Sequence, residues 1–380
     1  MEIDLKKLST NFDGTRSYIH TRGAIAPNGF GLFTTQPLRL SGSDVFYGMY
    51  MSFTYDGGET WSKLKPSKTI VRQDLGEGKE LAFTDATPLY HKKTGKIILI
   101  GHSVLYLNDE VFPDPRPRDM VYAVFNEEKM DFDEFIIADK PFGDDYEYFH
   151  WGNGSGQSYE LPNGDVLVPV DYMNKTEAGD SWHSCYKTAV MRCSFDGKKL
   201  RVIEAGNSLT VDIIRGLGEP SVIENNGEYF LALRNDESGY VSKGNDGLHY
   251  EKPVELVFDD GKNVGNYCTQ QHWIRGGGKL YLVYTRKGAN NDYVFRHRAP
   301  LFIAEFDCKN MCLIRDTEKV LIPNRGARLG NFGCFSFDDG KTGFCFAAEN
   351  MQANFPNISD WQQTAKYGSD GSIFIAKISF

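Results

Sequence analysis

The sequence repeats one hairpin pattern six times, and this repeat limits the possible folds more than any other feature. Each copy is an apolar strand, a turn that contains glycine and a second apolar strand. The copies cover residues 25–35, 88–101, 158–170, 221–233, 272–284 and 334–347. Their turn glycines recur at intervals of 51 to 69 residues, so six similar units account for the chain. A period of this size is typical of folds built from one repeated supersecondary unit.

Each interval between the hairpins holds further strand candidates. The runs VYAVF at 121–125, TAVMRCSF at 188–195 and LFIAEF at 301–306 are examples, and they allow four strands per unit. A ring of six such sheets leaves only short edges exposed. The sequence therefore predicts an all-β fold, a six-bladed β-propeller with four-stranded antiparallel blades, in one domain over residues 1–380. We expect the run 372–380 to complete the last sheet.

The composition agrees with such a fold and excludes several classes of partner. Hydrophobic residues make up 41% of the chain and aromatic residues 13%, which suits a compact β-rich protein. The formal net charge of -9 argues against a basic face that binds nucleic acid. No apolar stretch approaches the ~20 residues that span a bilayer, so we expect no membrane insertion.

Cysteine usage and the start of the chain add two further expectations. The seven cysteines form no C-x-x-C pair, so neither a zinc ribbon nor a disulfide framework is predicted, and we expect no metal or cofactor. The first residues, MEIDLKKLST, lack the apolar core of a signal peptide. We therefore expect a cytoplasmic protein as the sequence stands, or a periplasmic or secreted one if a leader has been removed.

Residues 52–62, SFTYDGGETWS, contain a more specific motif. Five of its residues fit the pattern S/T-x-D-x-G-x-T-W: Thr54, Asp56, Gly58, Thr60 and Trp61. The pattern resembles the Asp-box of sialidase-like β-propellers. We expect it to close the outer hairpin of the first blade as scaffold, and residues 194–197 and 245–250 look like eroded copies.

The residues just ahead of the six hairpins form the candidate binding site. In a propeller the first strand of each blade lines the central channel, so these residues should converge at one end of it. They are Arg22, Asp85, Gln157, Glu219, the run Gln270 to His272, and Asn331. We expect Asp85, Gln157, Gln271 and Asn331 to bind substrate there. A purely structural, water-filled channel would show similar polar residues.

The resemblance to sialidases extends to particular residues near these hairpins. Arg22 resembles the arginine that leads the first hairpin in that superfamily. Arg39 and Asp44 resemble a further arginine after that hairpin and the Asp acid/base in the loop before the first Asp-box. Glu219 and Arg234 fit the fourth-blade pattern E-P-x-x-x-x-x-x-G-x-x-x-x-x-x-R, which is the most specific of these matches.

A third arginine would complete a clamp for one carboxylate. Arg298, with Arg296 as a rival, precedes an apolar strand as the superfamily's third arginine does. Guanidinium groups bind carboxylates bidentately, so Arg22, Arg234 and Arg298 from different blades would hold an acidic sugar. The resemblance thus implies a sialic acid, a related nonulosonate or a uronic acid. For any single arginine, an ordinary ion pair is an equal alternative.

One position departs from the sialidase pattern. The superfamily's nucleophilic tyrosine leads the last hairpin, and here Asn331 stands at that place. A loop could supply another hydroxyl, from Tyr172, Tyr240 or Tyr267. Without one, Asp44 as acid and Glu219 as base would make an inverting hydrolase.

The histidines offer a second chemistry. His150 and His272 are each followed by tryptophan and lie near the start of an inner strand. Some sialidase-like propellers are uronate lyases or rhamnosyl-glucuronidases that use histidine, and these two residues are compatible with such sites. The sequence favours a glycoside hydrolase that cleaves a terminal acidic sugar from an oligosaccharide or polysaccharide. A lyase and a non-catalytic glycan-binding propeller are the alternatives.

Overall fold

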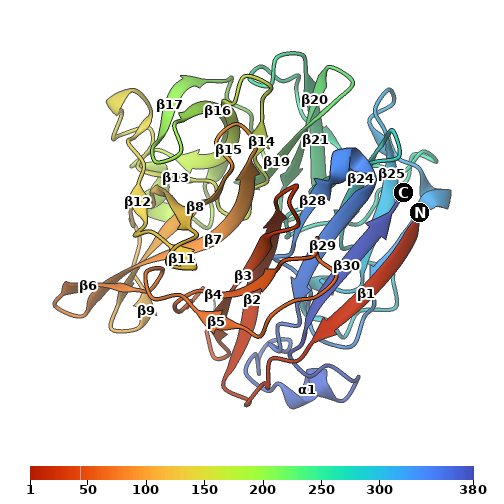
Figure 1. Cartoon of the computed structure of the whole chain (residues 1–380), viewed down its shortest axis with the longest axis horizontal. Coiled ribbons are helices and arrows are strands. Elements are labelled where there is room, and N and C mark those ends of the chain that lie inside the picture. The colour runs from red at the N-terminus through yellow and green to blue at the C-terminus, as the bar shows by residue number, and fades with distance from the viewer. Residues whose placement is uncertain (43) are drawn as a thin grey trace.

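The computed structural model describes residues 1–42 and 44–380, which form thirty β-strands in six sheets around a central axis (Figure 1). The first sheet contains β2 (Arg16–Ile25), β3 (Gly31–Arg39), β4 (Tyr50–Thr54) and β5 (Lys65–Pro66). The second contains β6 (Gln73–Gly76), β7 (Lys79–His91), β8 (Lys96–Leu107), β9 (Glu110–Val111), β10 (Met120–Asn126), β11 (Asp131–Phe132) and β12 (Ile136–Ile137). The third contains β13 (His150–Gly152), β14 (Tyr159–Glu160), β15 (Val166–Met173), β16 (Cys185–Phe195), β17 (Leu200–Ala205) and β18 (Arg215–Gly216).

The remaining three sheets complete the ring. The fourth contains β19 (Gly218–Asn225), β20 (Glu228–Arg234), β21 (Gly239–Gly244) and β22 (Val254–Glu255). The fifth contains β23 (His272–Gly276), β24 (Lys279–Tyr284), β25 (Leu301–Asp307), β26 (Cys312–Leu313) and β27 (Lys319–Ile322). The sixth contains β28 (Gly333–Phe337), β29 (Thr342–Ala348), β30 (Ile373–Ser379) and β1 (Glu2–Leu8). The prediction of an all-β propeller is confirmed, with additional short strands in the second, third and fifth sheets.

Helical structure is a minor part of the molecule. The one α-helix of the described residues, α1 (Gln362–Ala365), precedes the last strand. Across residues 1–42 and 44–380, no helix has the length and apolar character that crossing a membrane would require.

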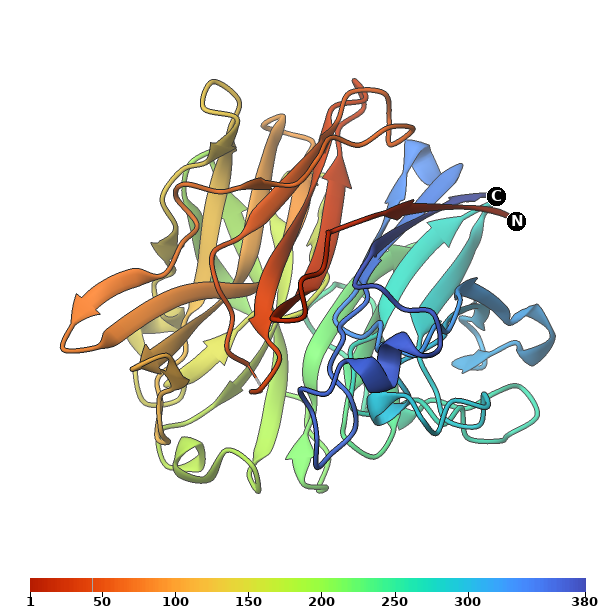
Figure 2. The same ribbon diagram turned by 90° about the horizontal axis from the view of Figure 1, so that it is seen from below.

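The two ends of the chain meet in the sixth sheet. β1 pairs antiparallel with β30 along seven positions, from Glu2 opposite Ser379 to Leu8 opposite Ile373. Figures 1 and 2 show the termini next to each other beside these strands. The prediction that residues 372–380 finish the last sheet was therefore incomplete, because β30 is its third strand and β1 its fourth. Pairing with β1 covers the edge that β30 would otherwise expose.

The Asp-box prediction is confirmed in detail. The motif joins β4 to β5, the third and fourth strands of the first sheet. Thr54 donates a hydrogen bond to the Asp56 carboxylate at 2.8 Å, and the Thr60 backbone N–H donates to the same group at 2.9 Å. Trp61 packs against Phe33 and against Phe346 of the sixth sheet. The motif thus fixes a turn and seals the contact between two blades.

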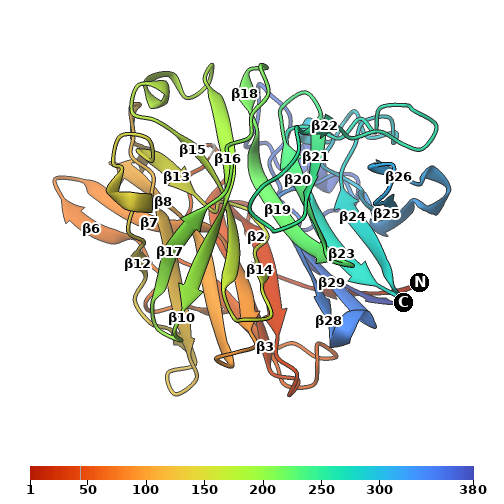
Figure 3. The same ribbon diagram turned by 90° about the horizontal axis from the view of Figure 1, so that it is seen from above.

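The inner strands follow one another around the axis, as β14, β19 and β23 do in Figure 3. Each inner strand has, within it or up to four residues before it, one residue other than glycine with a left-handed backbone, at φ between 45° and 63°. The six residues are His20, Asp85, Ser155, Glu219, Cys268 and Asn331. Left-handed residues of this kind cost conformational energy and often mark functional sites. Here they form a ring at one mouth of the channel.

Candidate functional site

A cavity of about 170 Å³ opens at this mouth, and all six blades contribute to its wall. Seven of the residues predicted from the sequence line it: Asp44, Asp85, His150, Glu219, Arg234, Arg298 and Asn331. The lining is strongly cationic. Seven arginines face the cavity: Arg116, Arg118, Arg215, Arg234, Arg296, Arg298 and Arg328.

Some of these arginines are already neutralised by carboxylates of the protein. Arg118 contacts Asp171 at 2.6 Å, and Arg234 forms ion pairs with Glu219 and, at 3.0 Å, with Asp236. Burial alone would lower the pKa of Arg234, but the charge of Glu219 holds it well above its ordinary value. These arginines shape the wall, and their charge is largely compensated.

Three other arginines differ in this respect. Within the described part of the chain, Arg296, Arg298 and Arg328 have no carboxylate within 4.0 Å. Arg298 donates to the Asn331 side chain at 3.1 Å and to the Cys268 backbone, while Arg328 donates to Gln352. Arg298 and Arg328 are 4% and 7% exposed, and the Nε of each lacks a partner among the residues described.

The pKa shifts of these groups agree with uncompensated charge. Burial, followed by repulsion from Arg296 and Arg234, lowers the pKa of Arg298 to about 10. Burial and the charges of Arg298 and Arg296 bring the pKa of Arg328 well below its ordinary value. Because guanidinium stays protonated in proteins, the cost appears as stored repulsion that an anion would relieve.

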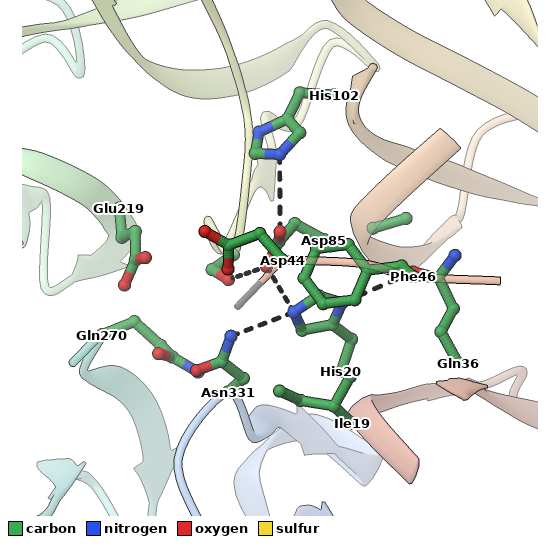
Figure 4. Close-up of polar contacts among 12 residues, drawn as sticks. Ile19, His20, Gln36, Asp44, Phe46, Asp85, His102, Glu219, Gln270 and Asn331 are labelled. Carbon is green, nitrogen blue, oxygen red and sulfur yellow. Dashed lines mark hydrogen bonds and ion pairs between the residues drawn. The ribbon is translucent and has the colours of Figure 1, made fainter. Parts of the chain in front are cut away.

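A chain of polar contacts crosses the floor of the cavity (Figure 4). The Asp85 carboxylate lies 2.7 Å from Nε2 of His20 and 3.4 Å from Nε2 of His102. Ser155 donates its hydroxyl to Asp85 at 2.6 Å. Burial raises the pKa of Asp85, but His20 and His102 together bring it well below its ordinary value. Asp85 is therefore a carboxylate at neutral pH.

Asn331 joins this chain to the arginines. Its amide nitrogen lies 2.9 Å from Nε2 of His20, and its oxygen accepts from Arg298. Among the residues that the structure describes, Tyr186 is the only tyrosine that lines the cavity, so the three tyrosines that the sequence suggested as sources of a hydroxyl lie elsewhere. They are Tyr172, Tyr240 and Tyr267.

His150 occupies the opposite side of the cavity. Its Nε2 lies 3.3 Å from the Tyr186 hydroxyl, and its Nδ1 lies 3.2 Å from the Arg116 carbonyl. Burial and the charge of Arg118 hold the pKa of His150 well below its ordinary value, so its ring is neutral at neutral pH. The pair could exchange a proton with a bound molecule.

Four predicted residues lie deeper in the channel or on its far side and do not line the cavity. Arg22 is fully buried and donates to Ser155 at 2.7 Å and to the carbonyls of Ala86 and Phe332. Its stem lies against Gly333, where a Cβ would come within 2.3 Å of the Arg22 Cγ. Arg22 therefore supports the floor of the cavity and cannot reach a ligand, which corrects the predicted clamp.

The other three are buried and do not line the cavity. The Gln157 amide accepts from the Trp273 backbone N–H at 2.8 Å and donates to the Trp273 carbonyl at 2.9 Å. His272 contacts the Ser221 hydroxyl at 3.0 Å, and burial with the nearby Arg22 lowers its pKa to about 3. Gln271 is 2% exposed. The predicted catalytic role of His272 and the predicted binding roles of Gln157 and Gln271 do not fit these positions.

Arg39 is the fifth predicted residue outside the cavity lining. Its guanidinium forms two hydrogen bonds with the Glu110 carboxylate, at 2.8 and 2.7 Å, and a third with the Asp109 carbonyl. It thus joins the first blade to the β8–β9 turn of the second. This ion pair accounts for Arg39 without a ligand.

Sequence reasoning missed several residues of the cavity. Arg328 lies three positions before Asn331, so the approach to the last hairpin could have drawn attention to it. His20 lies two positions before Arg22 in the same strand. His102 and Tyr186 come from the second strand of one blade, β8, and the third strand of another, β16. Site residues were expected near the inner strands, so these two were missed.

Comparison with known proteins identifies the class of fold. No family model and no curated protein matches the sequence. Among solved structures, a protein of unknown function from Dyadobacter fermentans matches with a TM-score of 0.65 and 14% identity over 99% of both chains. Trypanosoma rangeli sialidase matches with a TM-score of 0.62 and 13% identity. The fold is sialidase-like.

The extent of the match differs between these structures. The match with the trypanosomal sialidase covers 98% of the present chain but 58% of that protein, so the chain spans less than two thirds of its length. NanB sialidase of Streptococcus pneumoniae matches with a TM-score of 0.62 and 10% identity, over 97% of this chain and 70% of that one. At these identities the likeness concerns the fold alone.

Proposed function

We propose that the protein is a glycoside hydrolase that acts on a sugar bearing a carboxylate. The observation that carries this proposal is the group of arginines without carboxylate partners, Arg296, Arg298 and Arg328, at the wall of a cavity. A carboxylate bound there would take the two free Nε–H groups and relieve the repulsion among the guanidiniums. Arg328 takes the place of Arg22 in the predicted clamp, and Arg234 and Arg298 stay in it.

The same cavity holds the acidic groups that glycoside hydrolysis requires. Two carboxyl groups suffice, one to protonate the leaving oxygen and one to attack or to activate water. Asp44 lies in an exposed loop at the rim, which suits a proton donor to a leaving group that departs toward solvent. Glu219 and Asp85 line the cavity from two other blades and are the candidates for the second role.

The structural neighbours are consistent with an acidic sugar as ligand. Trypanosoma rangeli sialidase has been solved in complex with sialic acid. Sialic acid carries a carboxylate, and the present cavity offers cationic groups of the kind such a ligand needs. A partner that is an acidic oligosaccharide or polysaccharide follows from this proposal.

A uronate lyase is the second candidate, and one contact favours it. His150 is neutral and lies within hydrogen-bonding distance of Tyr186, with Arg118 and Arg215 stacked over the tyrosine ring at 5.7 and 5.0 Å. Such a pair could remove the proton next to a uronate carboxylate and return one to the leaving oxygen. This second proposal uses His150 for proton transfer and gives His272 no role.

The test is incubation of the purified protein with sialyl and uronate oligosaccharides. New reducing ends without ultraviolet absorbance would support hydrolysis, whereas the absorbance of an unsaturated uronate would support elimination. Binding without turnover would identify a glycan-binding propeller and contradict both enzymatic proposals.

Two variants connect the result to the arginines. Arg298→Gln should lower kcat/KM or affinity by about 100-fold or more, because it removes a charge-assisted contact to the ligand. Arg39→Gln is the matched control, since it removes an arginine outside the cavity lining that is already paired with Glu110. Equal activity of both variants would contradict the proposed anion site.

A further inference from the structure

The ring at the channel mouth contains a carboxylate whose surroundings differ from those of the other acidic groups in the cavity. Asp85 has a left-handed backbone at φ 52° and lies at a bulge between Thr84 and Thr87 in the pairing of β7 with β8. The bulge turns its side chain from the strand pairing toward the cavity, which it lines. A strained acidic residue at the floor of a site is a candidate for chemistry.

The two oxygens of Asp85 are not equivalent. Oδ1 lies 2.7 Å from His20 Nε2 and accepts from the Ser155 hydroxyl at 2.6 Å. Among the residues that the structure describes, Oδ2 has one long contact, 3.4 Å to His102 Nε2. One oxygen therefore fixes the group in place, and the other keeps lone pairs that can bond to carbon.

Cationic support for Asp85 comes from below, away from the cavity. The buried Arg22 lies 3.9 Å from Asp85 and donates to the same Ser155 hydroxyl. This arrangement keeps the carboxylate ionised without covering its free oxygen. Glu219 also has one fixed oxygen and one, Oε2, without a partner among the described residues. It differs in its cation, because Arg234, which pairs with its Oε1, itself lines the cavity.

We propose that Asp85 is the catalytic nucleophile of a retaining mechanism and that the substrate is a hexuronoside, a sugar whose carboxylate is on C5. The inference rests on the proposed function and makes it specific. In this scheme Asp85 is the nucleophile, a role that Asn331 does not fill because its side chain has no hydroxyl. His20 and Ser155 act as positioning residues that hold the carboxylate.

The reaction proceeds in two steps. Asp85 Oδ2 bonds to the anomeric carbon while the bond from that carbon to the leaving oxygen breaks, and the protonated Asp44 gives its proton to that oxygen. Asp44, now a carboxylate, removes a proton from a water molecule that attacks the anomeric carbon. The ester bond to Asp85 then breaks, and both carboxyl groups return to their initial states. The sum is hydrolysis by one water.

The anionic nucleophile determines the class of sugar. In a sialoside the carboxylate is attached to the anomeric carbon itself, so an attacking carboxylate would approach within ~4 Å of a like charge. Repulsion at that distance costs roughly a thousandfold in rate at an effective dielectric constant of about 20. In a hexuronoside the carboxylate lies across the ring oxygen from the anomeric carbon. The unpaired arginines can hold it there while Asp85 attacks from another blade.

Trapping of the intermediate on the wild-type protein is the first test. A 2-deoxy-2-fluorohexuronosyl fluoride loses fluoride to the nucleophile and forms an ester that hydrolyses slowly. We expect mass spectrometry of a protease digest to place this ester on Asp85. A glycosyl ester on Glu219 or an aryl glycoside on Tyr186 would overturn the inference, and so would net inversion at the anomeric carbon in the product of normal turnover.

Chemical rescue gives an independent readout. Asp85→Ala should lower kcat at least 1000-fold on a nitrophenyl hexuronoside. Azide should restore turnover and yield a glycosyl azide of the opposite anomeric configuration, because it attacks from the space left by the side chain. A merely structural role would show no rescue, which would overturn the proposal. Asp139→Ala, an exposed carboxylate of the same blade, should leave turnover unchanged.

The choice of substrates separates failure of this inference from failure of the proposed function. Turnover of nitrophenyl hexuronosides at least 100-fold faster than of nitrophenyl sialosides supports the hexuronoside class. Preference for sialosides would overturn it and leave an acidic-sugar hydrolase in place. Cleavage of neither would overturn the proposed function and this inference together.

Discussion

The central channel has two mouths, formed by opposite ends of the same inner strands, and they differ in chemistry. One holds the cationic cavity and the ring of left-handed residues. The other, at the hairpin turns, is a wider cavity of about 420 Å³ whose wall includes the side chains of Leu89, Val222, Phe335 and Phe337. At one mouth the repeated sequence forms regular hairpin turns. At the other mouth the residues differ from blade to blade, and the candidate site lies there.

The two mouths also differ in how their polar groups are satisfied. At the hairpin mouth the Gln157 amide pairs with backbone groups of Trp273 and Cys334. At the other mouth Arg298 and Arg328 keep an Nε–H without a partner among the described residues. The Gln157 amide is thus used fully by the fold, whereas Arg298 and Arg328 each retain a donor that a ligand could take and repel each other.

The largest effect should follow from Arg328→Met, which tests this difference directly. We expect kcat/KM for an acidic glycoside, or affinity for an acidic sugar, to fall by about 1000-fold, or about 4 kcal/mol, because a buried charge to the ligand is lost. We also expect a higher melting temperature, since the repulsion with Arg298 and Arg296 disappears. Ligand titration and thermal unfolding measure the two effects. A destabilised variant with normal affinity would contradict the comparison.

The ring of sheets could be predicted from the sequence because the turns of the repeated hairpins contain recognisable glycines. Glycines such as Gly29 and Gly95 adopt positive φ at these turns, at 87° and 68°, so their spacing reports the architecture directly. The closure by β1 was missed because the first strand has no hairpin partner next to it in sequence. Its pairing with β30 depends on the closed ring.

The site was predicted in part, and the errors share one cause. Asp85, Glu219 and Asn331 were placed correctly at the mouth, but in the first and third blades the mouth residues are His20 and Ser155, two positions before the predicted Arg22 and Gln157. Bulges and breaks in the inner strands shift the register by different amounts in each blade.

The arginine clamp shows the second limit of the sequence. Whether an arginine is free or paired depends on its neighbours in space. Arg39 and Arg298 look equally promising as residue types, but only the fold brings Glu110 to Arg39 and leaves Arg298 beside Arg328. The positions of Arg39 and Arg298 in the sequence therefore could not show which of the two is paired.

Gln157→Leu should produce the next largest effect, and it should be confined to stability. The substitution leaves the Trp273 N–H and the carbonyls of Trp273 and Cys334 unpaired in the channel. Each buried unpaired group costs about 1–3 kcal/mol, so we expect a loss of about 3 kcal/mol in the free energy of unfolding. Urea denaturation measures it. Turnover of the folded variant should equal that of the wild type, and a selective loss of activity would show that the two mouths are coupled.

A buried carboxyl group outside both mouths should add a pH dependence of its own. Burial raises the pKa of Glu349 to about 7, although the Asp370 N–H and Arg325 act to lower it. Its folded pKa exceeds its unfolded value, so its contribution to stability is complete below about pH 4.5 and is lost as the pH rises toward 7. Relative to Glu349→Gln, we expect the wild type to lose about 2 kcal/mol over this range. Parallel stability curves of the two proteins would contradict the raised pKa.

The smallest effect should come from Thr54→Val in the Asp-box, which lies at neither site. The substitution keeps the shape of a fully buried side chain but removes the hydrogen bond to Asp56 and the acceptor for the Gly58 N–H at 2.9 Å. We expect a loss of about 1 kcal/mol in the free energy of unfolding, the usual worth of such bonds. Activity should be unchanged, because the described residues of the turn pack between the first and sixth blades and do not line the cavity. If activity fell with stability, the mouth would depend on how tightly the ring is closed, and the separation between scaffold and site would not hold.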